Sequence, residues 1–121
     1  MGAKIDAIGL STPGFFRRGS IDMEVKAAKE CLKNAGVDPN LLGLLVNTGI
    51  YRDRHIGEPA IATLIQREIG ANEVFAGGRS TFSFDLTNGG CGILTGMMVI
   101  DGYLQSGNID YGMVVTADVD P

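Results

Sequence analysis

The fold is decided by residues 81–105, TFSFDLTNGGCGILTGMMVIDGYLQ. Residues 81 to 86 alternate between polar and apolar side chains, which is the two-residue period of a β-strand. A glycine-rich turn that holds Cys91 follows, and hydrophobic residues then surround most of the helical circumference as far as Gln105. The stretch therefore predicts a strand, a sharp turn and a helix from Cys91 to Gln105. We expect this helix to be enclosed by other elements, because it is apolar on nearly all sides.

The rest of the chain predicts further strands and helices in alternation. Short apolar segments bounded by turn residues indicate strands at residues 3–10, 41–47 and 111–117. Apolar residues at helical spacing indicate helices at residues 21–35 and 59–69. The residues expected at their ends are Ser20 as a cap, Pro59 at a first position, and Gly36 and Gly70 as stops. This strict alternation implies an α/β fold with a central, largely parallel sheet and helices on both faces.

The composition is that of a globular protein, and one domain is expected over residues 1–121. The chain has 121 residues, 45% of them hydrophobic and 20% charged, and a formal net charge of −4. A chain without a basic block is a poor nucleic-acid binder, because phosphate contacts need clustered lysine and arginine. The longest apolar-rich segment, residues 93–104, contains Asp101 and is shorter than the roughly 20 residues that span a bilayer. We therefore expect a soluble, cytoplasmic protein that binds neither nucleic acid nor a membrane.

The two cysteines differ in their surroundings. Cys91 follows a strand at the start of a helix, where the first-turn amides and the helix dipole favour a thiolate. A thiolate attacks thioesters, the Gly92 amide could donate to the resulting oxyanion, and Gly90 leaves room beside it. The alternative is that Cys91 is a small buried hydrophobe, as most free cysteines are. Cys31 is expected to pack in the core, and no metal site is expected because no cysteine or histidine pair has zinc spacing.

At this turn the sequence resembles a known family. The motif is Phe84-Asp85-Leu86-Thr87-Asn88-Gly89-Gly90-Cys91-Gly92, followed by an apolar helix, Gly107 and Val114-Val115. Upstream lie Asn34-Ala35-Gly36-Val37-Asp38-Pro39 before an apolar strand and Glu58-Pro59-Ala60 before a helix. Over residues 21–120 the chain resembles the thiolase superfamily, and most closely β-ketoacyl-acyl-carrier-protein synthase III and related condensing enzymes. The resemblance implies a thiolase-like half, corresponding to the N-terminal half of a family enzyme, with the C-terminal half absent.

The resemblance also implies roles for individual residues. Cys91 stands at the family's acyl-accepting cysteine, with glycines 90 and 92 where family members usually have alanine or serine, which makes the site wider and the elbow more flexible. Glu58 stands where the branch that joins two acyl thioesters has a glutamate that reaches across the dimer interface as a base. The alternative for Glu58 is an ordinary acidic residue at a helix start.

The charged loop before this helix contains further candidates. Arg52 and Arg54 could bind a phosphate of coenzyme A or an acidic carrier protein, or could form a solvated loop with Asp53. His55 is the only histidine, and nothing in the sequence supplies the partner that a catalytic base needs, so we expect it to be a loop residue. The resemblance implies that a histidine and an asparagine (or a second histidine) from the second half complete the site, and we expect this chain to lack them.

The sequence leaves two functions open. The first is an acyltransferase that forms a carbon–carbon bond by Claisen condensation of acyl thioesters, through an acyl group on Cys91. Coenzyme A or acyl-carrier-protein thioesters would be its substrates, and no permanently bound cofactor is expected. The second is a non-catalytic subunit or fragment that binds thioesters or dimerises. The resemblance further implies a homodimer that pairs through strand Thr81–Leu86, and a complementary C-terminal-half chain is a further expected partner.

Overall fold

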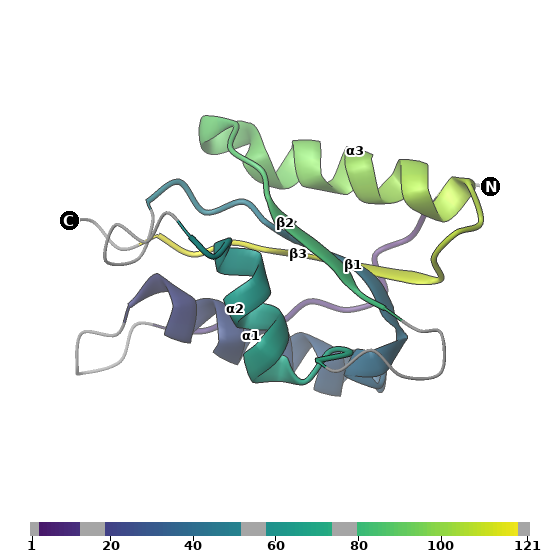
Figure 1. The fold of residues 1–121 in the computed structure, drawn as a ribbon, viewed down its shortest axis with the longest axis horizontal. Helices are drawn as coiled ribbons and strands as arrows, with labels where there is room; N and C mark the ends of the chain where they lie inside the picture. The colour runs from purple at the N-terminus through teal and green to yellow at the C-terminus, as the bar shows by residue number, and fades with distance from the viewer. Residues whose placement is uncertain (1–2, 13–18, 52–57, 74–79, 119–121) are drawn as a thin grey trace.

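The computed structural model describes residues 3–12, 19–51, 58–73 and 80–118, and it has three layers (Figure 1). Helices α1 (Ser20–Ala35) and α2 (Ile61–Ile69) cover one face of the sheet, and α3 (Gly92–Gln105) covers the other. The sheet has the order β2-β1-β3, with strands Phe82–Asp85, Leu42–Asn47 and Tyr111–Val115, and both pairings are parallel. Short 3-10 turns precede β1 (η1, Pro39–Leu41) and α3 (η3, Gly89–Cys91). The predicted α/β fold with a parallel sheet is therefore confirmed.

The central strand β1 connects the two halves of the core. Leu44, Leu45 and Val46 are completely buried, as expected for an apolar strand covered on both faces. Leu45 packs with the side chains of α1 and α2, whereas Leu44 and Val46 pack with Ile100 of α3. Successive residues of a strand point to opposite faces, so one uninterrupted apolar run serves both helical layers.

The helix ends agree with the sequence at their C-termini and differ at their N-termini. Gly36 and Gly70 take the left-handed conformation with φ of 67° and 76°, which glycine adopts without a steric penalty. The prediction that Ser20 caps α1 is wrong, because Ser20 lies in the first turn and is buried. The prediction that Pro59 opens α2 is also wrong, because that helix begins at Ile61.

The expected strand at residues 3–10 is absent, and the segment has no regular secondary structure. It crosses from α3 to α1, since Ala3 N donates to Asp101 Oδ1 (3.2 Å) and Ser11 Oγ donates to the Met23 carbonyl (2.8 Å). Side chains of α1 hold its middle, where Asn34 Nδ2 donates to the Ile8 carbonyl at 2.9 Å. A helix offers no free backbone edge, so this short apolar segment finds no strand to pair with among the described residues.

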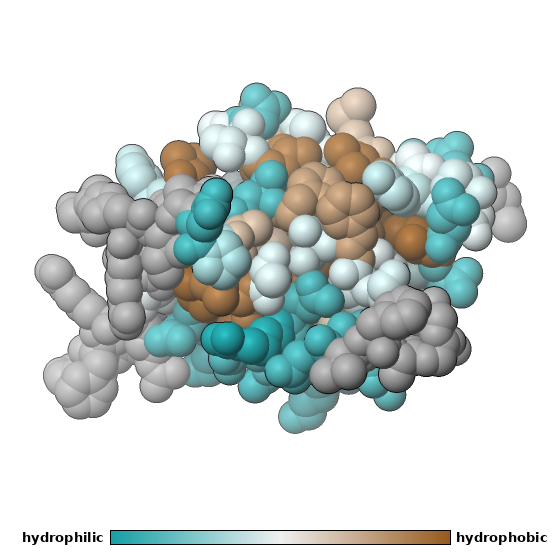
Figure 2. Space-filling model, viewed as in Figure 1, coloured by the Kyte–Doolittle hydropathy of each residue, from teal (hydrophilic) through white to brown (hydrophobic). Residues whose placement is uncertain are grey.

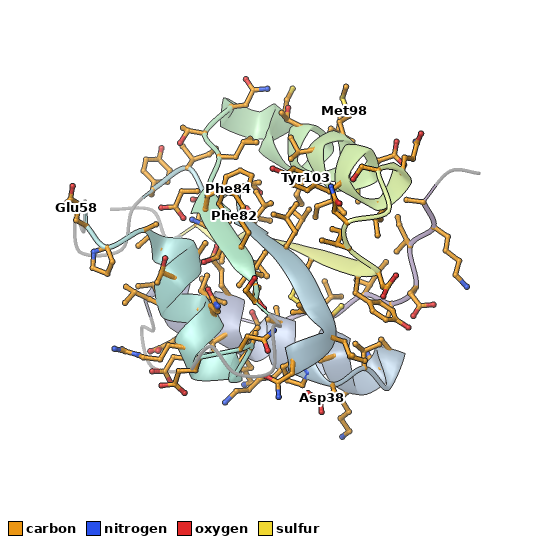
Figure 3. All side chains as sticks on the ribbon, turned by 45° about the vertical axis from the view of Figure 1, so that its right-hand side comes forward. Asp38, Glu58, Phe82, Phe84, Met98 and Tyr103 are labelled. Carbon is orange, nitrogen blue, oxygen red and sulfur yellow. The ribbon has the colours of Figure 1, made fainter. Side chains whose placement is uncertain are left out.

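The prediction that α3 is enclosed is wrong for its outer face. Leu94 and Met98 are 63% and 74% exposed, and Met98 points away from the sheet in Figure 3. The inner face packs closely because Gly96 has no side chain: a Cβ there would lie 3.2 Å from the side chains of Thr48 and Val114. The helix therefore contacts the sheet along one side and presents apolar side chains on the other.

Candidate functional site

The predicted cysteine lies at the predicted strand-to-helix turn. Strand β2 ends at Asp85, the turn η3 follows, and Cys91 is the cap residue that directly precedes α3. Its thiol is free and the residue is exposed, so the alternative of a small buried hydrophobe is wrong. The exposed thiol therefore lies at the amino end of α3.

Hydrogen bonds within the turn already use the nearby amides. Cys91 N donates to the Asn88 carbonyl at 3.1 Å, and Gly92 N donates to the Gly89 carbonyl. The Gly92 amide, expected to serve an oxyanion, could do so only by sharing its proton with Gly89. A side chain added at Gly90 would meet no atom within 4 Å, so this side of the turn is open.

The side of the turn that faces the sheet is held in position by its contact with the sheet. A Cβ at Gly92 would lie 3.0 Å from the Thr48 Cβ and 3.1 Å from the Thr48 carbonyl oxygen, so only glycine lets the helix start so close to β1. Asn47 of β1 is in register with Asp85 of β2 and with Val115 of β3. The thiol therefore lies at the carboxyl ends of three parallel strands, the edge at which open α/β sheets bind ligands.

Two polar residues at this edge were not candidates from the sequence. Asp85 accepts hydrogen bonds from Ile61 N (2.9 Å) and Ala62 N (2.8 Å), the first amides of α2, and from Asn47 Nδ2 (3.1 Å). Asn47 Oδ1 in turn accepts a bond from Gly49 N at 3.1 Å. The position of Asn47 could have revealed it, since this polar side chain directly ends an apolar strand, whereas Asp85 occupies an ordinary polar position of an alternating strand.

Glu58 is exposed and lies three residues before α2, and its peptide bond to Pro59 is cis. Figure 3 shows its side chain at the periphery, projecting away from the body of the chain. The structure does not bring Glu58 onto Cys91 of the same chain, and both interpretations of Glu58 stay open. A carboxylate in this position can reach solvent or a neighbouring molecule.

The loop candidates Arg52, Arg54 and His55 fall outside the described residues. The segment that leads to them is held by Asp118, whose Oδ1 accepts hydrogen bonds from Ile50 N (2.6 Å) and Tyr51 N (2.8 Å). Among the described residues no group of three acidic, cysteine or histidine side chains could hold a metal ion. None of the described helices combines the length and the apolar character that a membrane crossing requires.

Cys31 behaves as predicted, as a packing residue. It lies against the core of α1 and α2, and its Sγ donates to the Ala7 carbonyl at 3.4 Å. Burial raises the pKa of the Cys31 thiol, with a smaller contribution in the same direction from the Asp6 carboxylate, while a backbone bond from Gly9 opposes both. The two thiols thus differ in exposure within one molecule.

Comparisons with curated proteins place the chain beside condensing enzymes, although no family model matches it. Relatives include the acyl-CoA:acyl-CoA alkyltransferases of Shewanella oneidensis and Xanthomonas campestris, 33% identical over 97 residues and 29% identical over 125 residues. The β-ketoacyl-[acyl-carrier-protein] synthase III of Ehrlichia canis is 30% identical over 98 residues. These matches cover 80%, 98% and 81% of this chain, but 26%, 34% and 28% of the relatives. The chain therefore spans about a quarter to a third of their length.

Solved structures share the fold as well as the sequence. OleA of Xanthomonas campestris, as a cysteine-to-serine variant with bound lauric acid and lauroyl-CoA, gives a TM-score of 0.74 and 27% identity over 84% of this chain and 28% of that one. FabH of Xanthomonas oryzae, a 3-oxoacyl-(acyl carrier protein) synthase III, gives a TM-score of 0.70 and 32% identity. The match covers 79% of this chain and 26% of FabH. A glutamate-to-aspartate variant of OleA gives a TM-score of 0.76 and 25% identity. The match covers 87% of this chain and 30% of the variant. The chain therefore belongs to the thiolase superfamily of Claisen-type condensing acyltransferases, beside OleA and the β-ketoacyl-acyl-carrier-protein synthases III.

Proposed function

We propose that Cys91 accepts an acyl group from a coenzyme A or acyl-carrier-protein thioester, as the first step of a Claisen condensation. The single observation that carries this proposal is an exposed free thiol at the strand-to-helix turn, in a chain that belongs to a condensing-enzyme family. The Cys91 thiolate attacks the thioester carbonyl, and the thiol of coenzyme A or of the carrier leaves. The result is an acyl-cysteine thioester.

The second step forms the carbon–carbon bond. A carbanion at the α-carbon of a second thioester attacks the carbonyl of the acyl-cysteine, and the Cys91 thiolate leaves. The product is a β-ketoacyl thioester. The carbanion arises either by loss of carbon dioxide from a malonyl thioester or by removal of an α-proton. We assign the removal of that proton to Glu58 of a second subunit, because the exposed Glu58 carboxylate projects away from its own chain.

A second copy of the chain would bind at the β2 edge. This strand lies at the end of the sheet order, and Phe82 is 55% exposed in contact with Phe84, the two rings meeting edge to face at 5.3 Å. Figure 2 shows hydrophobic residues gathered on this face. An unpaired edge strand that carries exposed aromatic rings is a template for pairing with another strand. Pairing of two β2 strands would cover it.

The remaining groups of the site would come from a segment that corresponds to the part of the relatives that this chain does not match. The chain spans 26–34% of the length of its relatives, and the outer face of α3 presents Leu94 and Met98 to solvent. An exposed apolar patch of this kind marks an interaction surface. We propose that a second half, on the same or a separate chain, covers α3 and supplies the groups that stabilise the carbanion.

A non-catalytic thioester-binding subunit is the second candidate function, favoured by the Gly92 amide already bonded to Gly89. Intact mass spectrometry after incubation with acyl-coenzyme A thioesters of different chain lengths separates the two. We expect wild type to gain one acyl group, Cys31→Ser to gain it too, and Cys91→Ser to gain none. No adduct on wild type with any thioester would contradict the acyl-acceptor role and favour the binding subunit.

A further inference from the structure

The turn that carries Cys91 has little packing to hold it. Residues 88–91 are all exposed, and Gly89 has a φ of 50°. A side chain added at Gly89 or Gly90 would meet no atom within 4 Å. Two glycines in succession give the backbone wide conformational freedom, so such a turn is loose unless bonds restrain it. Hydrogen bonds must therefore hold Cys91 in place.

The Thr95 hydroxyl, one helical turn after Cys91, bridges the two ends of the turn. Asn88 Nδ2 donates to Thr95 Oγ1 at 2.8 Å, and the same hydroxyl donates to the Cys91 carbonyl at 3.1 Å. A threonine hydroxyl has one proton to donate and lone pairs to accept with, so both bonds form without conflict. The Thr95 side chain thus joins the residue before the turn to the last residue of the turn.

The backbone bonds of the turn depend on this bridge. Cys91 N donates to the Asn88 carbonyl, and Gly92 N donates to the Gly89 carbonyl. Both bonds weaken if Asn88 moves away from the helix, because Asn88 is the residue from which the turn starts. By tying the Asn88 side chain to α3, Thr95 keeps the turn closed and the Cys91 thiol at the amino end of the helix.

We propose that Thr95 is a positioning residue for Cys91. Thr95 holds Asn88 against α3 and so compensates for the conformational freedom of the glycine-rich turn. The inference deepens the proposed function and rests on it, since it concerns the thiol that accepts the acyl group. Thr95 would touch neither substrate nor the reacting atoms. It acts through the position of the thiol relative to the first-turn amides, which favour negative charge only over a short range.

The test compares Thr95→Val, which keeps the shape of the side chain, with Thr95→Ser, which keeps the hydroxyl. The first measurement is amide hydrogen exchange at Cys91 and Gly92. The second is the rate at which iodoacetamide modifies Cys91, with Cys31 in the same molecule as a monitor of general loosening. Loss of the bridge predicts about fivefold faster exchange and about fivefold slower Cys91 modification in Thr95→Val, at an unchanged Cys31 rate.

The controls separate this inference from the proposed function. Thr95→Ser should stay within about twofold of wild type, and Asn88→Ala, which removes the bridge from its other end, should match Thr95→Val. An unchanged Cys91 rate in Thr95→Val, or a serine variant that behaves like valine, would overturn the positioning role. A third outcome is that Thr95→Val slows the modification of Cys91 while the wild-type chain takes no acyl group from acyl-coenzyme A. That result would refute the proposed function and still support the positioning role of Thr95.

Discussion

Replacement of Asp85 by alanine should destabilise the whole fold, because its carboxylate serves donors from two other elements. It accepts bonds from the amides of Ile61 and Ala62 at the start of α2, and from the side-chain amide of Asn47 in β1. The helix has no side-chain cap of its own, since its cap residue is Ala60. Asp85 therefore caps α2 from a neighbouring strand.

The size of the effect follows from these contacts. Loss of a helix cap costs about 1 kcal/mol, and loss of a carboxylate at a helix amino end costs about 0.5 kcal/mol more. The amide of Asn47, which is only 4% exposed, would lose its acceptor at a cost of about 1–3 kcal/mol. We expect Asp85→Ala to lower the free energy of unfolding by about 2.5–4.5 kcal/mol, a large part of the roughly 5–15 kcal/mol of an ordinary domain. Asp85→Asn keeps one acceptor oxygen and should lose about half as much.

Equilibrium unfolding in urea, followed by circular dichroism, measures these differences. The control is Asp110→Ala, because Asp110 is exposed and its replacement should change the free energy of unfolding by less than about 0.5 kcal/mol. A loss below about 1 kcal/mol in Asp85→Ala would refute the reasoning, since the start of α2 would then be held by other contacts. Equal losses in the alanine and asparagine variants would contradict the expected role of the remaining acceptor oxygen.

Three further predictions concern the sheet edge, the helix contact and the buried thiol. Sedimentation at tens of micromolar protein should show that the wild type is a dimer. Phe82→Lys on β2 should dissociate this dimer, and Tyr111→Lys on β3 should leave it intact. A monomeric wild type would refute the prediction of a dimer. Gly96→Ala should destabilise the fold by about 1–3 kcal/mol in urea, because its Cβ would lie 3.2 Å from neighbouring side chains, whereas Gly102→Ala, with open space around it, should be neutral or stabilising. Because burial raises the pKa of Cys31 in the folded state, its contribution to stability is complete below the unfolded value near 9.0 and is lost as the pH rises through the folded value. The difference in unfolding free energy between wild type and Cys31→Ala should shrink over that range, and a constant difference would contradict this.

Local signals in the sequence predicted the elements that local forces determine. The apolar run before Asn47 became the buried central strand, because such a run suits a strand covered on both faces. Gly36 and Gly70 ended their helices, because the left-handed conformation favours glycine at that position. The turn at Cys91 also lies at the predicted position, because an alternating strand, a glycine cluster and an apolar helix follow one another directly in the sequence.

Apart from the cap of α1, which lies one residue before Ser20, the incorrect predictions depended on partners distant in the sequence. The start of α2 is determined by Asp85, 24 residues after Ile61, so a search for caps among adjacent residues could not find it. The segment at residues 3–10 has the pattern of a strand but no strand beside it among the described residues, and hydrogen-bonded pairing is what makes an extended segment a strand. The apolar character of α3 predicted burial but could not say which molecule or segment would cover it.

The placement of the groups implies that acylation and condensation have different requirements. The turn that carries Cys91 is held by contacts within this chain, through the close approach of Gly92 to Thr48 on the inner side and the Thr95 hydroxyl on the outer side. If Cys91 accepts the acyl group as proposed, acylation should need no residue from outside the chain. The Glu58 carboxylate projects away from the chain, and the outer face of α3 is exposed, so the proposed condensation should need at least one further surface. If both proposals hold, the chain should stop at the acyl-cysteine, and adding a partner that covers α3 should restore the second step without changing the rate of the first.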